Sequence, residues 1–162
     1  MRFDFRPSEE AVEFLREEIG LDLRGQDLDR TDRWQFVVAR NDHDAVIGAL
    51  VLEAKTWFDW HLSMAVVDHR CLLVTKLHKM LWRHVFEHAV RVTVLIDPEN
   101  AKLEHTVRKM GFVYEGFLRH GLDGDRDALV FGMLREDCRW LRSRPEAPQA
   151  APIENSEERV VH

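Results

Sequence analysis

The sequence lacks the features that mark several common classes of protein. Its 162 residues include only two cysteines, Cys71 and Cys138, which lie far apart in the sequence, so neither has a second cysteine a few residues away. This spacing excludes a disulfide framework and a cysteine-rich zinc site, and we expect both thiols to be reduced. No apolar run approaches the roughly 20 residues that a membrane-spanning helix needs. The N-terminal residues have neither the apolar stretch nor the cleavage site of a secretory signal, which favours the cytoplasm.

Positive charge is outnumbered by negative charge. The chain has 23 Lys and Arg residues against 29 Asp and Glu residues, a formal net charge of −6. A protein that wraps nucleic acid needs a concentrated Lys/Arg surface to neutralise phosphates, so nucleic acid is not expected as a partner. The length suits a single domain, which we place at residues 1–142. Residues 143–162 contain three prolines and few large apolar side chains, and we expect them to be a disordered tail.

Hydrophobic patterning in the first part of the chain predicts a helix and a hairpin. Residues 8–19 place apolar side chains on one helical face, between Ser8 at the start and Gly20 at the end. Residues 34–39 and 46–53 are rich in β-branched and aromatic residues, and the segment between them is polar and favours a turn. These two segments are therefore expected to pair as a β-hairpin.

The middle of the chain predicts a strand, a long helix and another strand. A strand is expected at residues 57–67, where aromatic residues suit a half-buried sheet surface. Residues 91–96 have the pattern of a short buried strand. Between them, a helix over residues 72–89 is predicted because apolar residues recur at intervals of three and four. These residues are Leu73, Leu77, Met80, Leu81, Val85 and Ala89.

The last part predicts a second long helix followed by two antiparallel strands. Asp97 is expected to cap the helix, with a proline in the first turn, and Gly111 to end it in a left-handed conformation. Residues 112–118 and 128–134 are predicted strands joined by a turn-rich segment. A short final helix is expected at residues 135–141.

The order of these elements and the segment IDPENAKLEHTVRKMGFVYEGFLR resemble the GNAT superfamily of acyltransferases. In that family an Asn opens the helix after the fifth strand, and a Gly-Phe pair follows eleven residues later; here these would be Asn100, Gly111 and Phe112. Residues 115–119 resemble the EG-x-x-R sequence of the branch that acetylates ribosomal proteins and antibiotics, and residues 127–135 are similar to its last strand. The resemblance covers about residues 34–141. Some bacteriophage proteins share this fold, and the short chain would suit one.

The resemblance implies an α/β fold with a mixed central sheet of about six to seven strands, flanked by helices, in which the fourth and fifth strands splay apart. It also implies acetyl-coenzyme A as the cofactor, with its pantetheine on the open strand edge and its pyrophosphate at the start of the next helix. Free N–H groups at a helix start carry partial positive charge and suit an anion. The residues implied to contact the cofactor are Ala65, Val66, Val67, Arg70, Cys71, Leu72, Leu73, Val74, Thr75 and Asn100.

The implied cofactor loop departs from the family pattern Arg/Gln-x-x-Gly-x-Gly/Ala. If Arg70 is the first residue of this pattern, Leu73 and Thr75 stand where small residues are expected. A leucine side chain there would occupy space near the pyrophosphate, because glycine lets phosphate approach the backbone. The alternative is that Leu72 and Leu73 are core residues of the following helix. Thr75 could still donate its hydroxyl to a phosphate.

Candidates for proton transfer are few. Asp59 and His61 fall on the fourth strand, where the family often has its general base, and a histidine titrates near neutral pH. The alternative for His61 is a half-buried structural role. The family's common acid, a Tyr, corresponds to Val107, and a Ser used by some members corresponds to Leu103; neither residue here can transfer a proton. Positioning and backbone donors can still accelerate direct attack by an amine on a thioester.

Two other groups of residues have alternative interpretations. His84 and His88 are four residues apart, which suits a metal, but no Glu stands at the metalloprotease position and we expect no metal site. Trp57, Phe58 and Trp60 could line an acceptor pocket or a partner surface, although sheet packing is the simpler interpretation.

Two hypotheses about function follow. The first is an N-acetyltransferase that moves an acetyl group from acetyl-coenzyme A to a primary amine on a small molecule or a protein. The second is a non-catalytic protein that keeps the fold as a scaffold, since Leu73, Leu103 and Val107 replace three functional residues. Such a protein would act as a homodimer or as an assembly component, for example in a virion. Arginines between residues 135 and 144 form a basic stripe that could meet an acidic partner or face solvent.

Overall fold

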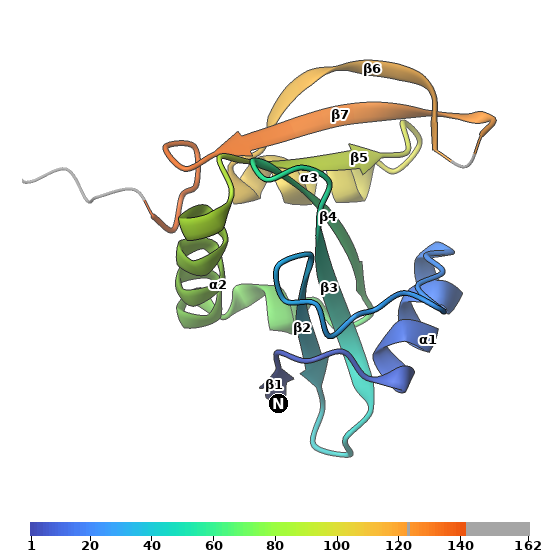
Figure 1. Cartoon of the computed structure of the whole chain (residues 1–162), viewed down its shortest axis with the longest axis vertical. Helices are drawn as coiled ribbons and strands as arrows, with labels where there is room; N and C mark the ends of the chain where they lie inside the picture. The colour runs from blue at the N-terminus through green and yellow to red at the C-terminus, as the bar shows by residue number, and fades with distance from the viewer. Residues whose placement is uncertain (123, 142–162) are drawn as a thin grey trace, which may run out of the picture.

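A computed structural model describes residues 1–122 and 124–141 of the chain, and the predicted tail at residues 143–162 lies outside them. The described residues form one seven-stranded sheet with helices on both faces (Figure 1). The strand order is β1-β2-β3-β4-β5-β7-β6. The strands are β1 (Arg2–Asp4), β2 (Trp34–Arg40), β3 (Val46–Ala54), β4 (Asp59–Val66), β5 (Arg91–Ile96), β6 (Val113–Leu122) and β7 (Arg126–Leu134). The helices are α1 (Glu9–Ile19), the 3-10 turn η1 (His69–Leu73), α2 (Thr75–His88) and α3 (Ala101–Met110).

The parallel pair β4–β5 confirms the expected splay. These strands pair over only three positions, ending at His61 opposite Thr93. Beyond this point, residues 62–66 of β4 remain paired with β3, and residues 94–96 of β5 remain paired with β7. The separation divides the sheet into a β1–β4 half and a β5–β7 half, which Figure 1 shows diverging. All other strand pairs are antiparallel, so the predicted mixed sheet is confirmed.

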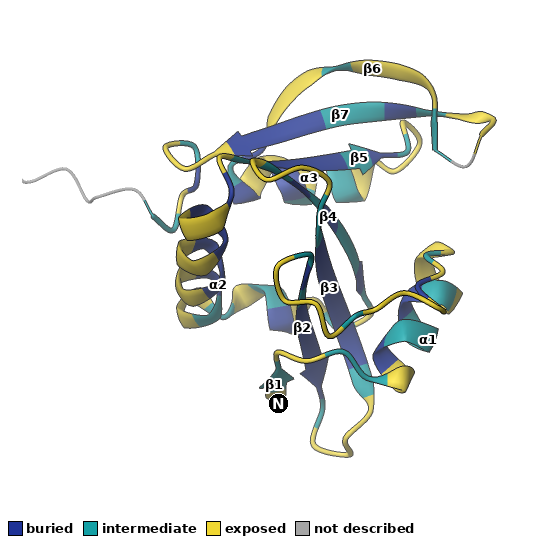
Figure 2. Ribbon diagram, in the orientation of Figure 1, coloured by how far each residue is buried: buried dark blue, intermediate teal, exposed yellow. Residues whose placement is uncertain are grey.

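Helices bury opposite faces of the sheet. Successive residues of a strand point to opposite faces, and β3 shows this clearly. Leu50 and Leu52 belong to the main core beneath α2 and α3, while Ala49 and Val51 belong to a smaller core beneath α1. The dark buried strands between exposed outer helix faces are visible in Figure 2. No helix in the described part of the chain has the length and apolar character needed to cross a membrane.

Several predicted boundaries are wrong near the long helices. The helix expected from residue 72 begins at Thr75, because the Asp68 side chain caps a separate 3-10 turn. Leu73 is consequently 77% exposed and is no core residue, and Met80 is 49% exposed. The second long helix begins at Ala101, where Asn100 accepts a hydrogen bond from the Leu103 amide at 3.0 Å.

Asp97, the expected cap, instead closes a turn before α3. Its side chain accepts a hydrogen bond from the Glu99 amide at 2.9 Å, and its carbonyl accepts one from Asn100. The helix expected at residues 135–141 is also wrong: the segment forms turns, because the Asp137 carboxylate accepts a hydrogen bond from the Leu134 amide. Gly111 ends α3 with a φ of 109°, as predicted.

Strand β1 was not predicted from the sequence. It pairs with β2 and is attached by Arg40, a buried side chain on β2. The Arg40 guanidinium contacts the carboxylates of Asp4 at 3.1 Å and Glu10 at 2.5 Å. Strand β1 and helix α1 are therefore both tied to the sheet through one buried cation.

Candidate functional site

A pocket of about 220 Å³ lies beside the open end of the β4–β5 separation. Residues from four elements line it: the end of β4, the turn η1, the start of α3 and the end of α1. Four of the residues implied to contact a cofactor meet here, namely Ala65, Val66, Leu72 and Asn100. The other lining residues are Glu18, Ile19, Met64, His69, Lys102, Leu103 and Thr106.

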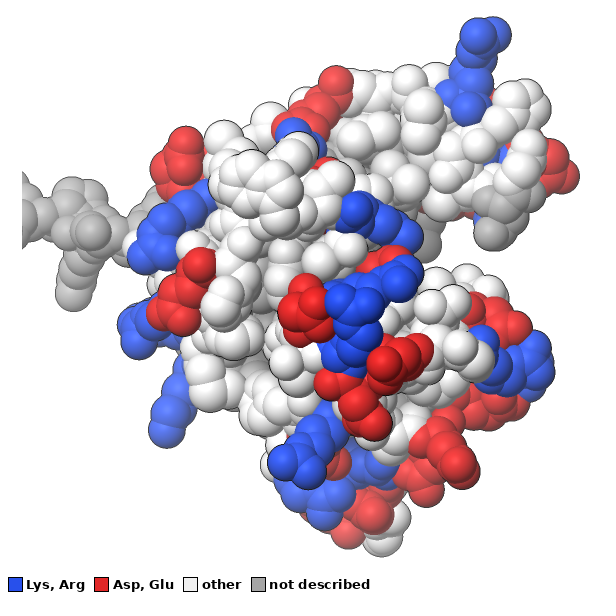
Figure 3. Space-filling model, in the orientation of Figure 1, with Lys and Arg blue, Asp and Glu red and all other residues white. Residues whose placement is uncertain are grey.

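A second pocket of about 410 Å³ continues between α2 and α3. It shares His69, Leu72, Lys102 and Thr106 with the first, and we call the two together the α2–α3 trough. Lys109 and Arg139 bring further positive charge, and Glu18 is the only acidic residue that lines either pocket among the residues described. This cationic lining contrasts with the chain's net charge of −6. Elsewhere both signs of charge mix, as Figure 3 shows around β1 and α1.

The start of α2 borders the trough. Val74 is the N-cap residue and its side chain makes no capping hydrogen bond. The first amides of the helix, from Thr75 onward, have no carbonyl partner within α2 and carry partial positive charge. Thr75 itself lines the second pocket. An anion in the trough would therefore meet backbone N–H groups as well as lysine and arginine side chains.

Two implied cofactor residues, Arg70 and Cys71, have side chains that are already engaged. The Arg70 guanidinium contacts the Asp68 carboxylate at 2.5 Å, and the hydrogen bonds from Arg70 lower the pKa of Asp68 to about 2. The Cys71 side chain is buried next to Gly48, and this burial raises the pKa of its thiol. Neither side chain lines the trough, whereas the exposed Leu73 does. Val67 is exposed just beyond β4.

The two candidate catalytic residues come together at the point where β4 and β5 separate. His61 and Thr93 are the last paired residues of the two strands. The Asp59 carboxylate accepts a hydrogen bond from the Thr93 hydroxyl at 2.8 Å and lies 3.5 Å from Nε2 of His61. Arg91 lies 3.6 Å from Asp59 and contacts Glu115 at 2.5 Å. These five residues form what we call the apex cluster, which lines neither pocket of the trough.

An arrangement of this kind suits a histidine general base. The Asp59 carboxylate lies close enough to Nε2 of His61 to orient the imidazole, and a neutral imidazole has one ring nitrogen that can accept a proton. Both side chains are partly exposed, so a substrate could reach them. By contrast, Val107 is fully buried in the main core, and Leu103 packs against that core. These two residues have packing roles in α3.

The sequence analysis missed the positive charge of α3. Lys102 and Lys109 are seven residues apart and therefore lie on one helical face, away from the inward residues Val107 and Met110. His105 and Thr106 lie between them and also line the trough. The spacing of these polar residues was available in the sequence. The contribution of Arg139 was not, because it depends on how the segment after β7 turns back toward α3, where Arg139 donates to the Lys109 carbonyl.

Comparisons with known proteins identify only the fold. No protein-family model matches the chain, and no curated protein matches it significantly. Among solved structures, smu.2055 from Streptococcus mutans UA159 has a TM-score of 0.62 at 18% identity, covering 83% of this chain and 99% of its own. Mutant forms of the spermidine/spermine N-acetyltransferase SpeG from Vibrio cholerae have a TM-score of 0.60 at 15% identity, covering 82% and 95%. Nourseothricin acetyltransferase has a TM-score of 0.54 at 23% identity, covering 63% and 65%. At these identities the likeness establishes the architecture, and the chain has the GNAT fold.

Proposed function

We propose that the chain is an N-acetyltransferase that transfers an acetyl group from acetyl-coenzyme A to a primary amine. The observation that carries this proposal is the separation of β4 and β5 next to a trough with cationic side chains and free helix amides. An open strand edge offers backbone groups to the amides of pantetheine, and the trough offers positive charge to phosphates. Coenzyme A needs both the open strand edge and the cationic trough, and in this chain the two lie next to each other.

The residues of the trough fit the cofactor's chemistry. Residues 62–66 of β4 lack a β5 partner and would pair with the pantetheine arm. The α2 amides would receive the pyrophosphate, and Lys102, Lys109 and Arg139 would neutralise the remaining phosphate charge. Leu73 stands at the rim with its side chain in solvent, so it narrows the entrance without filling the pocket. Arg70 makes its ion pair with Asp68 and contributes little.

The proposed reaction uses the apex cluster. The amine nitrogen attacks the thioester carbonyl carbon, the carbon–sulfur bond breaks, and coenzyme A leaves as a thiolate. His61, oriented by Asp59, accepts the amine proton, which then passes through solvent to the thiolate. No side chain replaces the family's acid at Val107, so we expect a modest turnover. The cluster has two carboxylates and one guanidinium, a balance that attracts a substrate with positive charge. One of the similar solved structures is named a spermidine/spermine N-acetyltransferase.

A second proposal is a non-catalytic scaffold, and exposed apolar residues favour it. Strand β6 is at the edge of the sheet and exposes the apolar side chains of Val113, Phe117 and Leu118. Trp57, expected to pack on the sheet, is 80% exposed, while Trp60 is buried as expected. These residues would contact a second copy or an assembly partner, for instance in a phage particle.

Calorimetric titration with acetyl-coenzyme A separates the two proposals. An enzyme should bind it saturably with a dissociation constant in the micromolar range, on the order of −8 kcal/mol. Reversing the charge of Lys102 and Lys109 to Glu should weaken binding at least about tenfold. The matched control is Lys79→Glu, an exposed lysine of α2 outside the trough. If the unmodified chain does not bind acetyl-coenzyme A, the enzyme proposal is wrong and the scaffold proposal remains.

Substituting His61 tests the catalytic part separately. His61→Gln should lower kcat by about a hundredfold and leave the affinity for acetyl-coenzyme A unchanged, because the residue lies outside the trough. The rate of acetyl transfer is measured as release of the coenzyme A thiol, with a panel of polyamines and aminoglycosides as trial acceptors. An unchanged kcat would remove His61 from the mechanism.

Leu73 tests the proposed loop alignment. Leu73→Gly should tighten acetyl-coenzyme A binding about threefold or more if the side chain stands where phosphate approaches. Leu73→Ala removes the same bulk without adding backbone freedom and serves as the control. Equal affinities for all three proteins would show that the alignment of Arg70, Leu73 and Thr75 with the family loop is wrong.

A further inference from the structure

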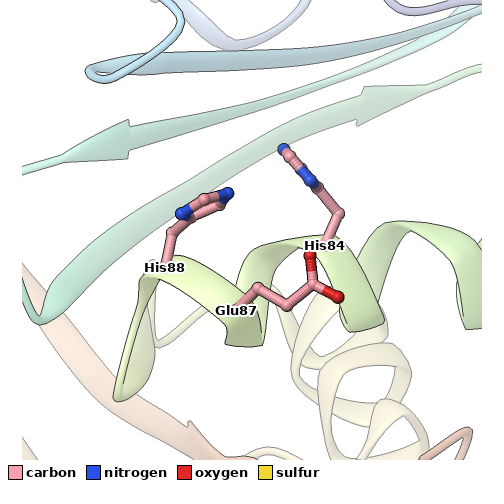
Figure 4. Close-up of side chains that lie close together, drawn as sticks. All are labelled: His84, Glu87 and His88. Atoms are coloured by element: carbon pink, nitrogen blue, oxygen red, sulfur yellow. The ribbon is translucent and has the colours of Figure 1, made fainter.

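Three potential metal ligands lie together on the outer face of α2, away from the trough. These are His84, Glu87 and His88, and their ligating atoms all lie within 4.8 Å of one another. Figure 4 shows both imidazoles projecting from the same side of the helix, with the Glu87 side chain extending toward His84. The two rings are 4.9 Å apart in a T-shaped arrangement. Within the described part of the chain, none of the three side chains makes a hydrogen bond or ion pair, and all three residues are exposed.

The helix itself produces this arrangement. Residues four apart lie one turn above each other on one face, and the residue three along from the first lies beside them. In a tetrahedral site with ligands about 2.1 Å from the ion, ligating atoms are roughly 3.4 Å apart. Rotation about the side-chain torsions of these exposed residues can close the difference from 4.8 Å. No change in the backbone of α2 is required.

We propose that His84, Glu87 and His88 form a binding site for a divalent transition-metal ion of the Zn²⁺ type. Two imidazole nitrogens and one carboxylate oxygen are the ligand set that Zn²⁺ accepts, and nitrogen ligands disfavour Mg²⁺ and Ca²⁺. Three protein ligands leave one position of a tetrahedral ion open to water. Glu87 is not at the position that the H-E-x-x-H metalloprotease order requires, but the inverse order found here, H-x-x-E-H, occurs in another class of zinc peptidase. Here, however, the site is on an exposed helix face, so the proposal is of binding and not of peptide hydrolysis.

The surroundings of the site indicate moderate affinity. His84 and His88 line a hollow of about 560 Å³ together with Asp32 and Trp57, so a second carboxylate, a potential fourth ligand, faces the same space. Asp32 is paired with Arg30, which reduces its availability. On the other side, His84 and Glu87 border a hollow with several cations, which oppose a bound dication. These cations are Lys76, Lys79 and Arg83.

The test is titration of the full chain, without a histidine tag, with ZnCl₂ in a buffer that does not chelate metal. We expect one equivalent to bind with a dissociation constant in the micromolar range, on the order of −8 kcal/mol. His84→Ala and His88→Ala should each weaken binding at least about a hundredfold, and Glu87→Gln about tenfold. The matched control is His43→Ala, an exposed histidine in the turn between β2 and β3, which should bind like the unmodified chain.

Two further measurements distinguish this site from the chain's other histidines. Zn²⁺ bridging one turn of α2 should raise the Tm of the unmodified chain but not that of His84→Ala. Cu²⁺, which prefers the same ligands, should quench the fluorescence of Trp57 next to the site, and Trp57→Phe should remove that part of the quenching. Binding that survives His84→Ala, or a Tm response that is the same in both proteins, would overturn the proposal.

Discussion

Gly20 and Gly111 end α1 and α3 in the same left-handed region of the backbone, with φ of 71° and 109°. Their surroundings differ. A Cβ added at Gly20 would have no neighbour within 4 Å, whereas one added at Gly111 would overlap the carbonyl oxygen of Asp137. Gly111 is therefore needed both for its conformation and for the close approach of the segment that follows β7.

Alanine at these two glycines should separate strain from overlap. Gly20→Ala should lower the free energy of unfolding by about 1 kcal/mol, the strain of a left-handed non-glycine residue. Gly111→Ala should lower it by about 3 kcal/mol, because the backbone of the neighbouring segment must also move. Urea denaturation of both variants measures the difference. Equal losses of unfolding free energy in the two variants would mean that the segment around Asp137 moves away from the added Cβ without destabilising the fold.

At the scale of elements, the sequence predicted those whose signals are local. Helix α1 has a capping Ser8 and a terminal Gly20, the β2–β3 hairpin has a polar turn between apolar strands, and β5 is a short buried run. Each depends only on neighbouring residues. Strand β1 depends instead on pairing with β2 and on the ion pairs of Arg40, which are distant in sequence and leave no local pattern.

The candidate site was predictable to the same extent. The resemblance implied that Ala65, Val66, Leu72 and Asn100 contact one cofactor, and in the structure these four residues line one pocket. The sequence could not predict in which direction each side chain of η1 points. Asp68 caps that turn and holds Arg70, and the resulting geometry turns Leu73 into solvent. Such local competition for hydrogen bonds is not visible in hydrophobic periodicity.

One contact between elements should make stability depend on pH. His78 of α2 is only 3% exposed, its ring stacks on Trp140 at 4.1 Å, and its Nε2–H donates to the Leu72 carbonyl at 2.8 Å. Burial lowers its pKa below the ordinary value of 6.5, with a smaller contribution from Arg139. The unfolded chain therefore takes up a proton below pH 6.5 that the folded chain resists. Stability from this residue is present above that pH and is lost as the pH falls toward the folded pKa.

Comparing the unmodified chain with His78→Phe should reveal this effect. Phenylalanine retains a ring to stack on Trp140 but does not titrate. Between about pH 7.5 and pH 5.5, the unmodified chain should lose on the order of 1 kcal/mol more of its unfolding free energy than the variant. Chemical denaturation at the two pH values measures both losses, and parallel losses would show that His78 is not the titrating group.

At the scale of the whole molecule, strand pairing between the two halves of the sheet is limited, in the described residues, to three residue pairs of β4 and β5. The α2–α3 trough draws on both halves: Ala65 and Val66 come from the β4 side, while Asn100 and Lys102 follow β5 in the chain. A ligand in the trough would thus contact two parts of the sheet that otherwise separate. Binding of such a ligand should slow amide exchange in both halves of the sheet, whereas a ligand on an outer surface would slow exchange in one half.

Hydrogen exchange with and without acetyl-coenzyme A tests this expectation. Bound cofactor should slow exchange several-fold at residues 62–66, at residues 94–96 and at the first amides of α2, since these lose access to solvent or gain a partner. The paired residues 59–61 and 91–93 serve as an internal control, because their strands are already joined. Protection confined to one half of the sheet would place the cofactor outside the separation of β4 and β5, since a ligand held there must shield the edges of both strands.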